Sequence, residues 1–311
     1  MKALVFTRPG VVEIDDVPDV IVAAGEEVVD VELAGICGSE LHGVTTPGFR
    51  VPPLVMGHEF VGRTSDDRRV AVNPLSACGE CDHCRSGQSQ LCRTRSLLGV
   101  HKSGGFAERV AVPSRSIHEL PEGLEWERAA LIEPIANAVH AWSRADSPIG
   151  KRIGIIGCGA IGIACLEVAR SFGAGSVSCA DVTELRRTLA DGLGADAVGE
   201  VLSDEYDVIF DAVGIAPTRE MSIERLKPGG TTVWLGLAST ISGFDATNAV
   251  RFEKSVRGTF AYNDEEFATA VALAPELDLS WSATFALDDG ADIFTELMHG
   301  RVTPVKALLR P

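Results

Sequence analysis

The stretch RIGIIGCGAIGIACLEVARSFG, residues 152–173, is the part of the sequence that decides the fold. It begins with a short apolar run typical of a buried strand. Glycines then follow in the spacing G-x-G-x-x-G, and a helical pattern continues to a stop at Gly173. A strand, a glycine loop and a helix in this order form the context in which the motif binds a dinucleotide. The stretch therefore predicts a parallel sheet covered by helices, with a nucleotide at the ends of its strands.

The three glycines have separate physical roles in such a loop. Gly157 permits a tight turn, Gly159 lets the pyrophosphate approach the backbone, and Gly162 allows close packing of helix on strand. The helix N-terminus, which includes Ala160 and Ile161, then directs its free N–H groups and positive dipole end at the phosphates.

The next predicted strand ends at Asp181. A carboxylate at this point accepts hydrogen bonds from the ribose hydroxyls of NAD and repels the 2′-phosphate of NADP. We therefore expect NAD, although Arg186 and Arg187 lie close enough downstream to leave NADP open, and Arg186 is a candidate cofactor contact. The alternative is a helix-capping Asp181 in an unrelated α/β protein, which the whole motif disfavours.

The predicted secondary-structure pattern divides the chain into two regions. Residues 1–125 hold short β-like runs cut by Gly and Pro, which predict an all-β domain of barrel type. Strands and helices alternate over 126–262, including a helix over 218–230 ended by Pro-Gly. Residues 263–311 are too few for a third domain, so we expect them to pack with the first one. The predicted fold class is α/β, with domains at 1–125 plus 263–311 and at 126–262.

Charge and hydropathy exclude several classes of partner. The chain has 28 basic and 44 acidic residues and a net charge of −16, which disfavours nucleic acid and anionic membranes. No apolar stretch is long enough to span a bilayer. The opening MKALVFTRPG predicts a strand and a turn rather than a signal peptide. Without a secretory signal, the eight cysteines favour metal binding in a reducing cytoplasm over a disulfide framework.

Four of those cysteines lie in the run CGECDHCRSGQSQLC, within residues 78–92. Four thiolates at this spacing can surround Zn²⁺ tetrahedrally, and a site closed by four protein ligands is structural. Iron in a rubredoxin-like site and free buried thiols are the alternatives. The candidate ligands are Cys78, Cys81, Cys84 and Cys92.

A second set of candidate ligands has a different composition. Cys37 lies in GICGSELHG, His58 and Glu59 lie in MGHEFVG, and Glu133 precedes the dinucleotide-binding region. A mixed thiolate, imidazole and carboxylate set suits Zn²⁺, and three protein ligands would leave one position open for chemistry.

The matching motifs together resemble the zinc-dependent medium-chain alcohol dehydrogenase family, in its polyol, sorbitol and threonine dehydrogenase branch. They are GICGSELH, GHEFVG, the four-cysteine run, GGFAERVAVP, EPIANAVHA, GCGAIG and DVIFDAVG, in the family's order. The resemblance implies a GroES-like catalytic domain, a Rossmann domain and a cleft between them. It also implies that Cys37 and His58 bind catalytic zinc, with either Glu59 or Glu133 as third ligand.

The same resemblance implies roles for further residues. Ser39 and His42 would form a relay for the alcohol proton, and Lys306 would contact the pyrophosphate. Val213, in DVIFDAVG, is a further candidate cofactor contact. The substrate stays open among polyols, secondary alcohols and amino alcohols. Relatives form dimers or tetramers by joining sheet edges, here near SVRGTFAY, residues 255–262. The competing hypotheses are a non-enzymatic zinc-stabilised NAD sensor and a zinc-loop interaction module.

Overall fold

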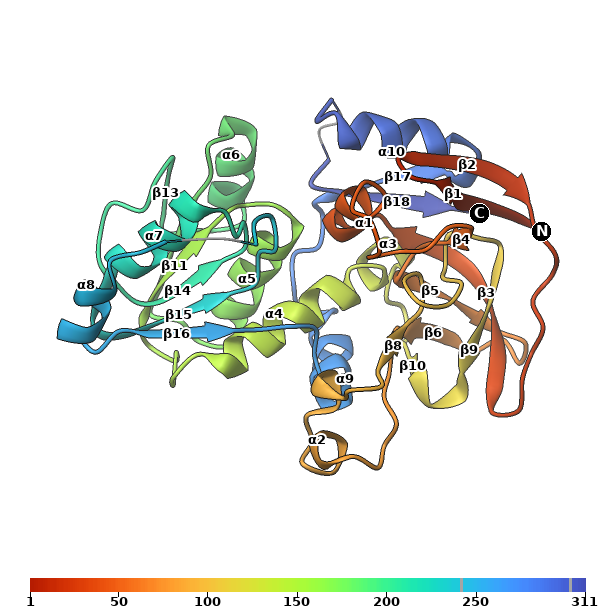
Figure 1. Cartoon of the computed structure of the whole chain (residues 1–311), viewed down its shortest axis with the longest axis horizontal. Helices are drawn as coiled ribbons and strands as arrows, with labels where there is room; N and C mark the ends of the chain where they lie inside the picture. Colours follow the sequence, from red (N-terminus) through yellow and green to blue (C-terminus); the bar gives the residue numbers. More distant parts are fainter. Residues whose placement is uncertain (241–242, 302–303) are drawn as a thin grey trace. The chain divides into compact units, whose positions relative to one another are not determined.

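The computed structural model describes residues 1–240, 243–301 and 304–311, and it divides into two compact units (Figure 1). Unit 1 comprises Met1–Glu133 and Asn263–Pro311, and unit 2 comprises Pro134–Tyr262. The C-terminal residues therefore fold with the N-terminal ones, although a whole unit separates them in the sequence.

Unit 2 is built on a parallel sheet covered by helices. Among the described residues its strands run in the order β13-β12-β11-β14-β15-β16, and every neighbouring pair is parallel. The first strand of this unit, β11, lies in the middle of the sheet. The strands β12 and β13 are added on one side of it and the strands β14, β15 and β16 on the other, so the switch point where nucleotides bind in such folds lies between β11 and β14. The strands are β11 (Arg152–Ile156), β12 (Ser176–Ala180), β13 (Ala197–Gly199), β14 (Tyr206–Asp211), β15 (Leu226–Trp234) and β16 (Ser255–Gly258).

Helices connect these strands, as the alternating sequence predicts. Ile153, Ile155 and Ile209 are fully buried in the sheet, which explains why the strands read as continuous apolar runs. The helices are α4 (Ile132–Arg144), which contains the boundary between the units, α5 (Ala160–Ser171), α6 (Glu184–Gly192), α7 (Ala216–Glu224) and α8 (Ala246–Arg251).

One predicted element of unit 2 is wrong in extent. The helix expected over 218–230 ends at Glu224, and β15 already begins at Leu226. The Pro228-Gly229 pair, taken as a helix stop, lies inside this strand segment instead. The register shift between β14 and β15 falls at the same place, between Tyr206 and Val208, so the irregular pairing accommodates the proline.

Unit 1 contains the β-rich part of the chain. Its main sheet follows the path β10-β6-β5-β3-β18-β17, with β9 also paired to β3, and a second sheet has the order β2-β1-β4. Its strands are β1 (Lys2–Arg8), β2 (Val11–Asp16), β3 (Glu26–Gly35), β4 (Leu54–Val55), β5 (Glu59–Thr64), β6 (Arg69–Val72), β7 (Leu75–Ser76), β8 (Ser96–Leu97), β9 (Arg109–Pro113), β10 (Ile117–Glu119), β17 (Ser282–Ala286) and β18 (Lys306–Arg310).

Short helices complete unit 1. The sequence predicts a helix after Asn263 with a capping box, and α9 has this cap, with Asn263 and Glu266 bonded reciprocally. The helices are α1 (Gly38–Gly43), α2 (Asp82–Arg85), α3 (Trp126–Ala129), α9 (Asp264–Leu273) and α10 (Gly290–Met298), with 3₁₀ turns η1 (Ser89–Leu91), η2 (Ser114–Ser116) and η3 (Leu287–Asp289).

The core of unit 1 joins residues from both ends of the chain. Leu4 and Val29 lie in the same buried cluster as Phe294 and Leu309. Because β18 pairs with β3, the end of the chain lies beside the strand that leads into Cys37. This pairing determines the composition of the site described next.

Candidate metal centres and cofactor site

The first metal cluster lies where β3 ends and β5 begins. The two strands are antiparallel, and Gly35 is opposite Glu59, so Cys37 comes close to His58 and Glu59. A ligand atom from each of these three residues lies within 4.8 Å of the others. A side chain at position 35 would collide with the Glu59 carboxylate, so this glycine leaves the space that the acid needs.

Glu40 lies outside the three-residue group but contacts two of its members. It is fully buried, and its Oε1 lies 2.9 Å from His58 Nδ1 and accepts from the Gly57 N–H at 2.9 Å. Its Oε2 accepts from the Cys37 N–H at 3.0 Å. With Nδ1 engaged by a carboxylate, Nε2 of His58 is the nitrogen available to a metal, which is the usual outer-shell arrangement of metal-binding histidines.

Lys306 has a different place from the one predicted. The family resemblance implies that it contacts the pyrophosphate. In the structure its ammonium group lies 2.8 and 2.6 Å from the Glu59 carboxylate oxygens, and it also donates to the Ile36 carbonyl at 3.1 Å. The side chain is 2% exposed, so the ion pair is buried beside the metal cluster.

Buried charges in this cluster support one another. Burial alone would lower the pKa of Lys306, but Glu59, Cys37 and Glu133 more than offset burial and raise it. Burial also opposes the charge of His58, yet Glu40 and Cys37 raise its pKa well above the ordinary value. The acidic groups of the cluster are therefore paired with positively charged groups of the protein itself. The same acidic groups could pair with a bound metal ion instead.

The other residues predicted for this site lie around the three-residue group. Glu133 is buried at the N-terminus of α4 and is close enough to raise the pKa of Lys306, but it is outside that group. Ser39 is half-buried on α1, and its N–H donates to Cys37 Sγ at 3.5 Å. His42 is exposed in the last turn of α1, three residues from Ser39 and thus on a neighbouring part of the same helix face.

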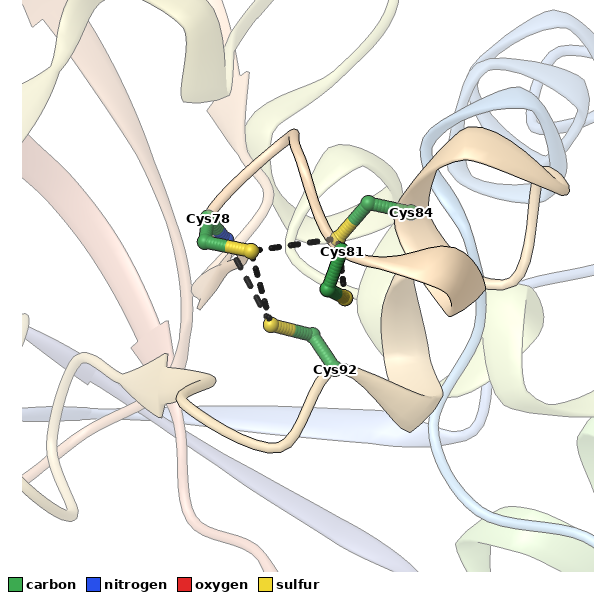
Figure 2. Close-up of side chains that lie close together, drawn as sticks. All are labelled: Cys78, Cys81, Cys84 and Cys92. Atoms are coloured by element: carbon green, nitrogen blue, oxygen red, sulfur yellow. Dashed lines mark hydrogen bonds between the residues drawn. The ribbon is translucent and has the colours of Figure 1, made fainter.

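The four cysteines of the second cluster converge on one point (Figure 2). Cys78 Sγ lies 3.8 Å from Cys84 Sγ and 3.6 Å from Cys92 Sγ, and Cys81 Sγ lies 3.5 Å from Cys84 Sγ. The Cys78 N–H and the Thr94 hydroxyl lower the pKa of Cys92 to about 6, which favours its thiolate. Four converging sulfur atoms, one of them readily ionised, fit a structural zinc ion.

In unit 2 the glycine loop has the geometry that the motif predicts. Gly157 has a φ of +90°, in the region that favours glycine, and a side chain on Gly162 would collide with the Gly157 carbonyl. Nothing lies within 4 Å of the position that a Cβ on Gly159 would occupy. The space over Gly159, at the N-terminus of the long helix α5, fits a pyrophosphate. Ala160 and Ile161 form the first turn of this helix.

Asp181 lies beside this loop, directly after β12. Its carboxylate accepts from the Cys158 N–H and the Thr183 N–H, both at 2.8 Å. Arg186 Nη1 is 3.7 Å from the same carboxylate. Val213 is adjacent too, since a side chain on Gly157 would strike it. The structure thus brings together the cofactor residues predicted in unit 2, whereas Lys306 belongs to the metal cluster of unit 1.

Sequence reasoning missed two supporting acids. Glu40 is one of them, and its spacing from Cys37 is that of a capping box, which α1 has. Asp211, at the end of β14, is fully buried and accepts from the Val213 and Gly214 N–H groups, both at 3.0 Å. An acid directly after a buried strand is the signal that could have revealed it.

Comparisons with known proteins agree with this geometry. Residues 23–122 match the alcohol dehydrogenase GroES-like domain, and residues 160–276 match the zinc-binding dehydrogenase family. An L-threonine 3-dehydrogenase from Saccharopolyspora erythraea is 33% identical, over 90% of this chain and 90% of its own length. The chain belongs to the zinc-dependent medium-chain alcohol dehydrogenase family.

Solved structures of other family members have the same fold. Galactitol-1-phosphate dehydrogenase from Escherichia coli superposes with a TM-score of 0.93 at 26% identity, covering 100% of both chains. A zinc-binding dehydrogenase from Sinorhizobium meliloti bound to NADP has a TM-score of 0.92 at 26% identity, covering 100% of this chain and 99% of its own.

Membership of this medium-chain dehydrogenase family makes the chain an oxidoreductase that uses zinc and a nicotinamide cofactor. The predicted α/β fold, with a GroES-like part and a Rossmann-type parallel sheet, is confirmed. No comparison supports the non-enzymatic sensor. Within the described ranges, no helix has both the length and the hydropathy needed to cross a bilayer.

Proposed function

We propose that this dehydrogenase oxidises a polyol, secondary alcohol or amino alcohol with NAD, at a catalytic zinc held by Cys37, His58 and Glu59. The observation that supports this proposal is the convergence of three different ligand types within 4.8 Å, with Glu40 occupying the other nitrogen of His58. Glu133 is the alternative carboxylate, because it is buried nearby. A zinc ion bound there would supply a Lewis acid that lowers the alcohol pKa from roughly 16, a value similar to that of water.

Ser39 and His42 are proposed to carry the alcohol proton to solvent. The hydroxyl of Ser39 accepts the proton from the substrate O–H group and passes its own proton to His42. His42 is exposed and can release a proton to water. The substrate carbon then transfers its hydrogen with two electrons to the nicotinamide C4 atom, which gives a ketone or aldehyde and NADH.

The NAD site is proposed to lie in the domain of residues 126–262, and the zinc ligands Cys37, His58 and Glu59 in the domain of residues 1–125 and 263–311. Gly157, Gly159 and Gly162 would hold the pyrophosphate, and the buried Asp181 carboxylate would bind the adenosine ribose. The negative charge of Asp181 supports NAD over NADP, because the carboxylate would repel the 2′-phosphate of NADP. Hydrogen bonds from the Cys158 and Thr183 N–H groups hold this carboxylate in place. Arg186 lies at the rim of that site and would touch the ribose or its substituent.

The Ser39→Ala variant tests the proposed relay. We expect kcat for alcohol oxidation to fall by about 10²-fold or more and its pH dependence to change, because a relay step contributes about 10² to 10⁴. Ser86→Ala is the matched control, since the Ser86 hydroxyl donates only to the His83 carbonyl in the cysteine lobe. A panel of polyols, secondary alcohols and amino alcohols, followed by NADH absorbance, would identify the substrate. Full activity of Ser39→Ala would remove Ser39 from the mechanism.

A homodimer or homotetramer is proposed to form through the edge of the unit 2 sheet. Among the described strands β16 is an edge strand, and the apolar side chains of Val256 and Phe260 in this region are 37% and 39% exposed. Edge strands readily pair with a second chain. Monomeric behaviour in sizing chromatography would contradict the oligomer.

A reducing cytoplasm is the proposed compartment, supported by eight free cysteines.

A further inference from the structure

Arg50 is a buried arginine next to the metal cluster that no part of the proposed function uses. It lies in the segment between α1 and β4, and its side chain is 2% exposed. Its guanidinium group is 5.0 Å above the ring of Phe49. A fully buried arginine is rare unless specific partners hold it, so its contacts are informative.

Two hydrogen bonds of Arg50 join the two sides of the metal cluster. Nη1 donates to the Ser39 carbonyl at 2.7 Å, in the helix whose N-cap is Cys37. Nε donates to the Gly99 carbonyl at 3.0 Å. Gly99 packs so closely on Gly57 that a Cβ at position 99 would lie 2.6 Å from the Gly57 carbonyl oxygen. Gly57 directly precedes His58, so one guanidinium group connects the backbone after one ligand to the backbone before another.

The sequence leaves space for this guanidinium. Gly43, the last residue of α1, does not have a positive φ, so its backbone does not require glycine. A Cβ at position 43 would nevertheless collide with Arg50 Nη1. The side chain of Arg50, with the Phe49 ring as a second and less close neighbour, therefore explains glycine at this position.

The third nitrogen of the guanidinium indicates that Arg50 does more than fill space. Nη2 is buried and has no hydrogen-bond partner among the residues that the structure describes. A buried donor without a partner is destabilising, so an apolar side chain would fill the same volume at a lower free-energy cost. The two hydrogen bonds to the Ser39 and Gly99 carbonyls must offset this cost. This indicates that the role of Arg50 is to hold these two backbone segments in a fixed relative position.

We propose that Arg50 is a positioning residue, whose guanidinium clamps the helix after Cys37 to the loop that packs on the residue before His58. The inference rests on the proposed catalytic zinc site. Without the clamp, α1 and the Gly57 backbone shift relative to each other, and the spacing of the metal ligands is less well fixed. Supporting residues around metal ligands contribute about 10–100-fold to metal affinity or activity.

The test compares Arg50→Met, Arg50→Lys and Gly43→Ala with the parent enzyme, using the full chain loaded with zinc. We expect Arg50→Met to lose the catalytic zinc to a chelator about 10–100-fold faster and to lower kcat more than it changes the KM for NAD. When cobalt replaces zinc at the catalytic site, the visible spectrum of Arg50→Met should differ from that of the parent enzyme. Arg50→Lys, which keeps the charge but cannot span both carbonyls, should restore only part of the loss.

Gly43→Ala provides an independent route to the same effect. The added methyl group displaces the guanidinium without removing it, so we expect Gly43→Ala to lose zinc faster, as Arg50→Met does. In the double variant with Arg50→Met, Gly43→Ala should increase the rate of zinc loss little further. It also keeps the test possible if Arg50→Met does not fold. Arg128→Met is the matched control, because Arg128 also donates to backbone carbonyls, but to those of Ala274 and Pro275, which are not adjacent in sequence to any candidate ligand. It should lower stability without changing the cobalt spectrum.

The number of zinc ions bound by the parent enzyme tests the catalytic site, and the behaviour of the variants tests the role of Arg50. If the parent enzyme binds only one zinc ion, the proposed catalytic site fails, independently of Arg50. If it binds two, and the Arg50 and Gly43 variants retain the parent cobalt spectrum and rate of zinc loss, Arg50 is not a positioning residue. The latter conclusion holds even when those variants are less stable.

Discussion

The ammonium group of Lys306 and the carboxylate of Glu59 form an ion pair whose side chains are 2% and 0% exposed. Their atoms come as close as 2.6 Å, although 247 residues separate them in the chain. The pairing of β18 with β3 brings Lys306 to this position. A bound metal ion would compete with Lys306 for the same carboxylate, because both are cations.

Replacing Lys306 with Met should therefore have different effects with and without zinc. In chelator-treated protein we expect a loss of about 3–5 kcal/mol in the free energy of unfolding, because Glu59 becomes an unpaired buried charge. Zinc-loaded protein should lose less, since the metal neutralises Glu59. Denaturant unfolding of both forms measures the difference. Lys227→Met, which breaks the more exposed pair with Asp207, should cost the same in both forms. Equal losses for Lys306→Met would contradict the prediction.

The third zinc ligand can be identified by comparing two acids. Glu59 belongs to the three-residue group, whereas Glu133 lies outside it. We expect Glu59→Gln to weaken zinc binding at the catalytic site by at least about tenfold, and Glu133→Gln to weaken it less. Competition with a chelator of known affinity measures both. The opposite order would assign the ligand to Glu133.

The cysteine cluster should hold its own metal ion independently. Cys92→Ser removes the thiol with the lowered pKa, so we expect the loss of one of the two metal ions per chain and a lower unfolding temperature. Burial raises the pKa of Cys165 to about 12, and Cys165→Ala is the control that should retain both ions. Elemental analysis measures the ions and distinguishes zinc from iron. Retention of both ions by Cys92→Ser would refute the assignment.

Cofactor choice should depend on the charge of Asp181. Asp181→Ala removes the charge and the hydrogen bonds from the Cys158 N–H of the glycine loop and the Thr183 N–H before α6, so we expect a lower kcat/KM with NAD and a smaller difference between NAD and NADP. Asp181→Asn retains an acceptor oxygen and should keep more of the activity with NAD. Steady-state rates with both cofactors test this. A parent enzyme that prefers NADP would overturn the role of Asp181.

Asp207 provides a pH-dependent contribution to stability. Burial alone would raise its pKa, but the Arg152 N–H and the Lys227 ammonium group outweigh burial and lower it. A carboxylate whose folded pKa is depressed stabilises the protein above its unfolded value of about 3.9, and the stabilisation is lost as the pH falls through the folded pKa.

We therefore expect Asp207→Asn to destabilise the protein by about 1 kcal/mol at neutral pH, and the difference from the parent to shrink below about pH 4. Denaturant unfolding of parent and variant over this pH range measures the difference. Asp204→Asn is the control, because Asp204 is 61% exposed in its pair with Arg152. A difference that does not change with pH would show that the carboxylate charge is not responsible.

The sequence by itself determined the parts of the molecule whose signals are local. Gly157, Gly159 and Gly162 identified the nucleotide loop because their spacing reflects backbone requirements within one strand, turn and helix. The cysteine run predicted a cluster of four thiols that could hold a metal ion, because the four cysteines lie within 15 residues of sequence. The helix after Asn263 was predictable from its capping box, which also involves only neighbouring residues.

Only the tertiary structure decided which distant side chains support the catalytic cluster. Lys306 reaches Glu59 through the pairing of the last strand with β3, and no local pattern encodes that pairing. Arg50 and Glu40 lie near the ligands in sequence, but their roles depend on burial and on which backbone groups face them. Burial and partner choice arise when remote segments pack together, so motif spacing predicted the candidate ligands but not the residues that surround and support them.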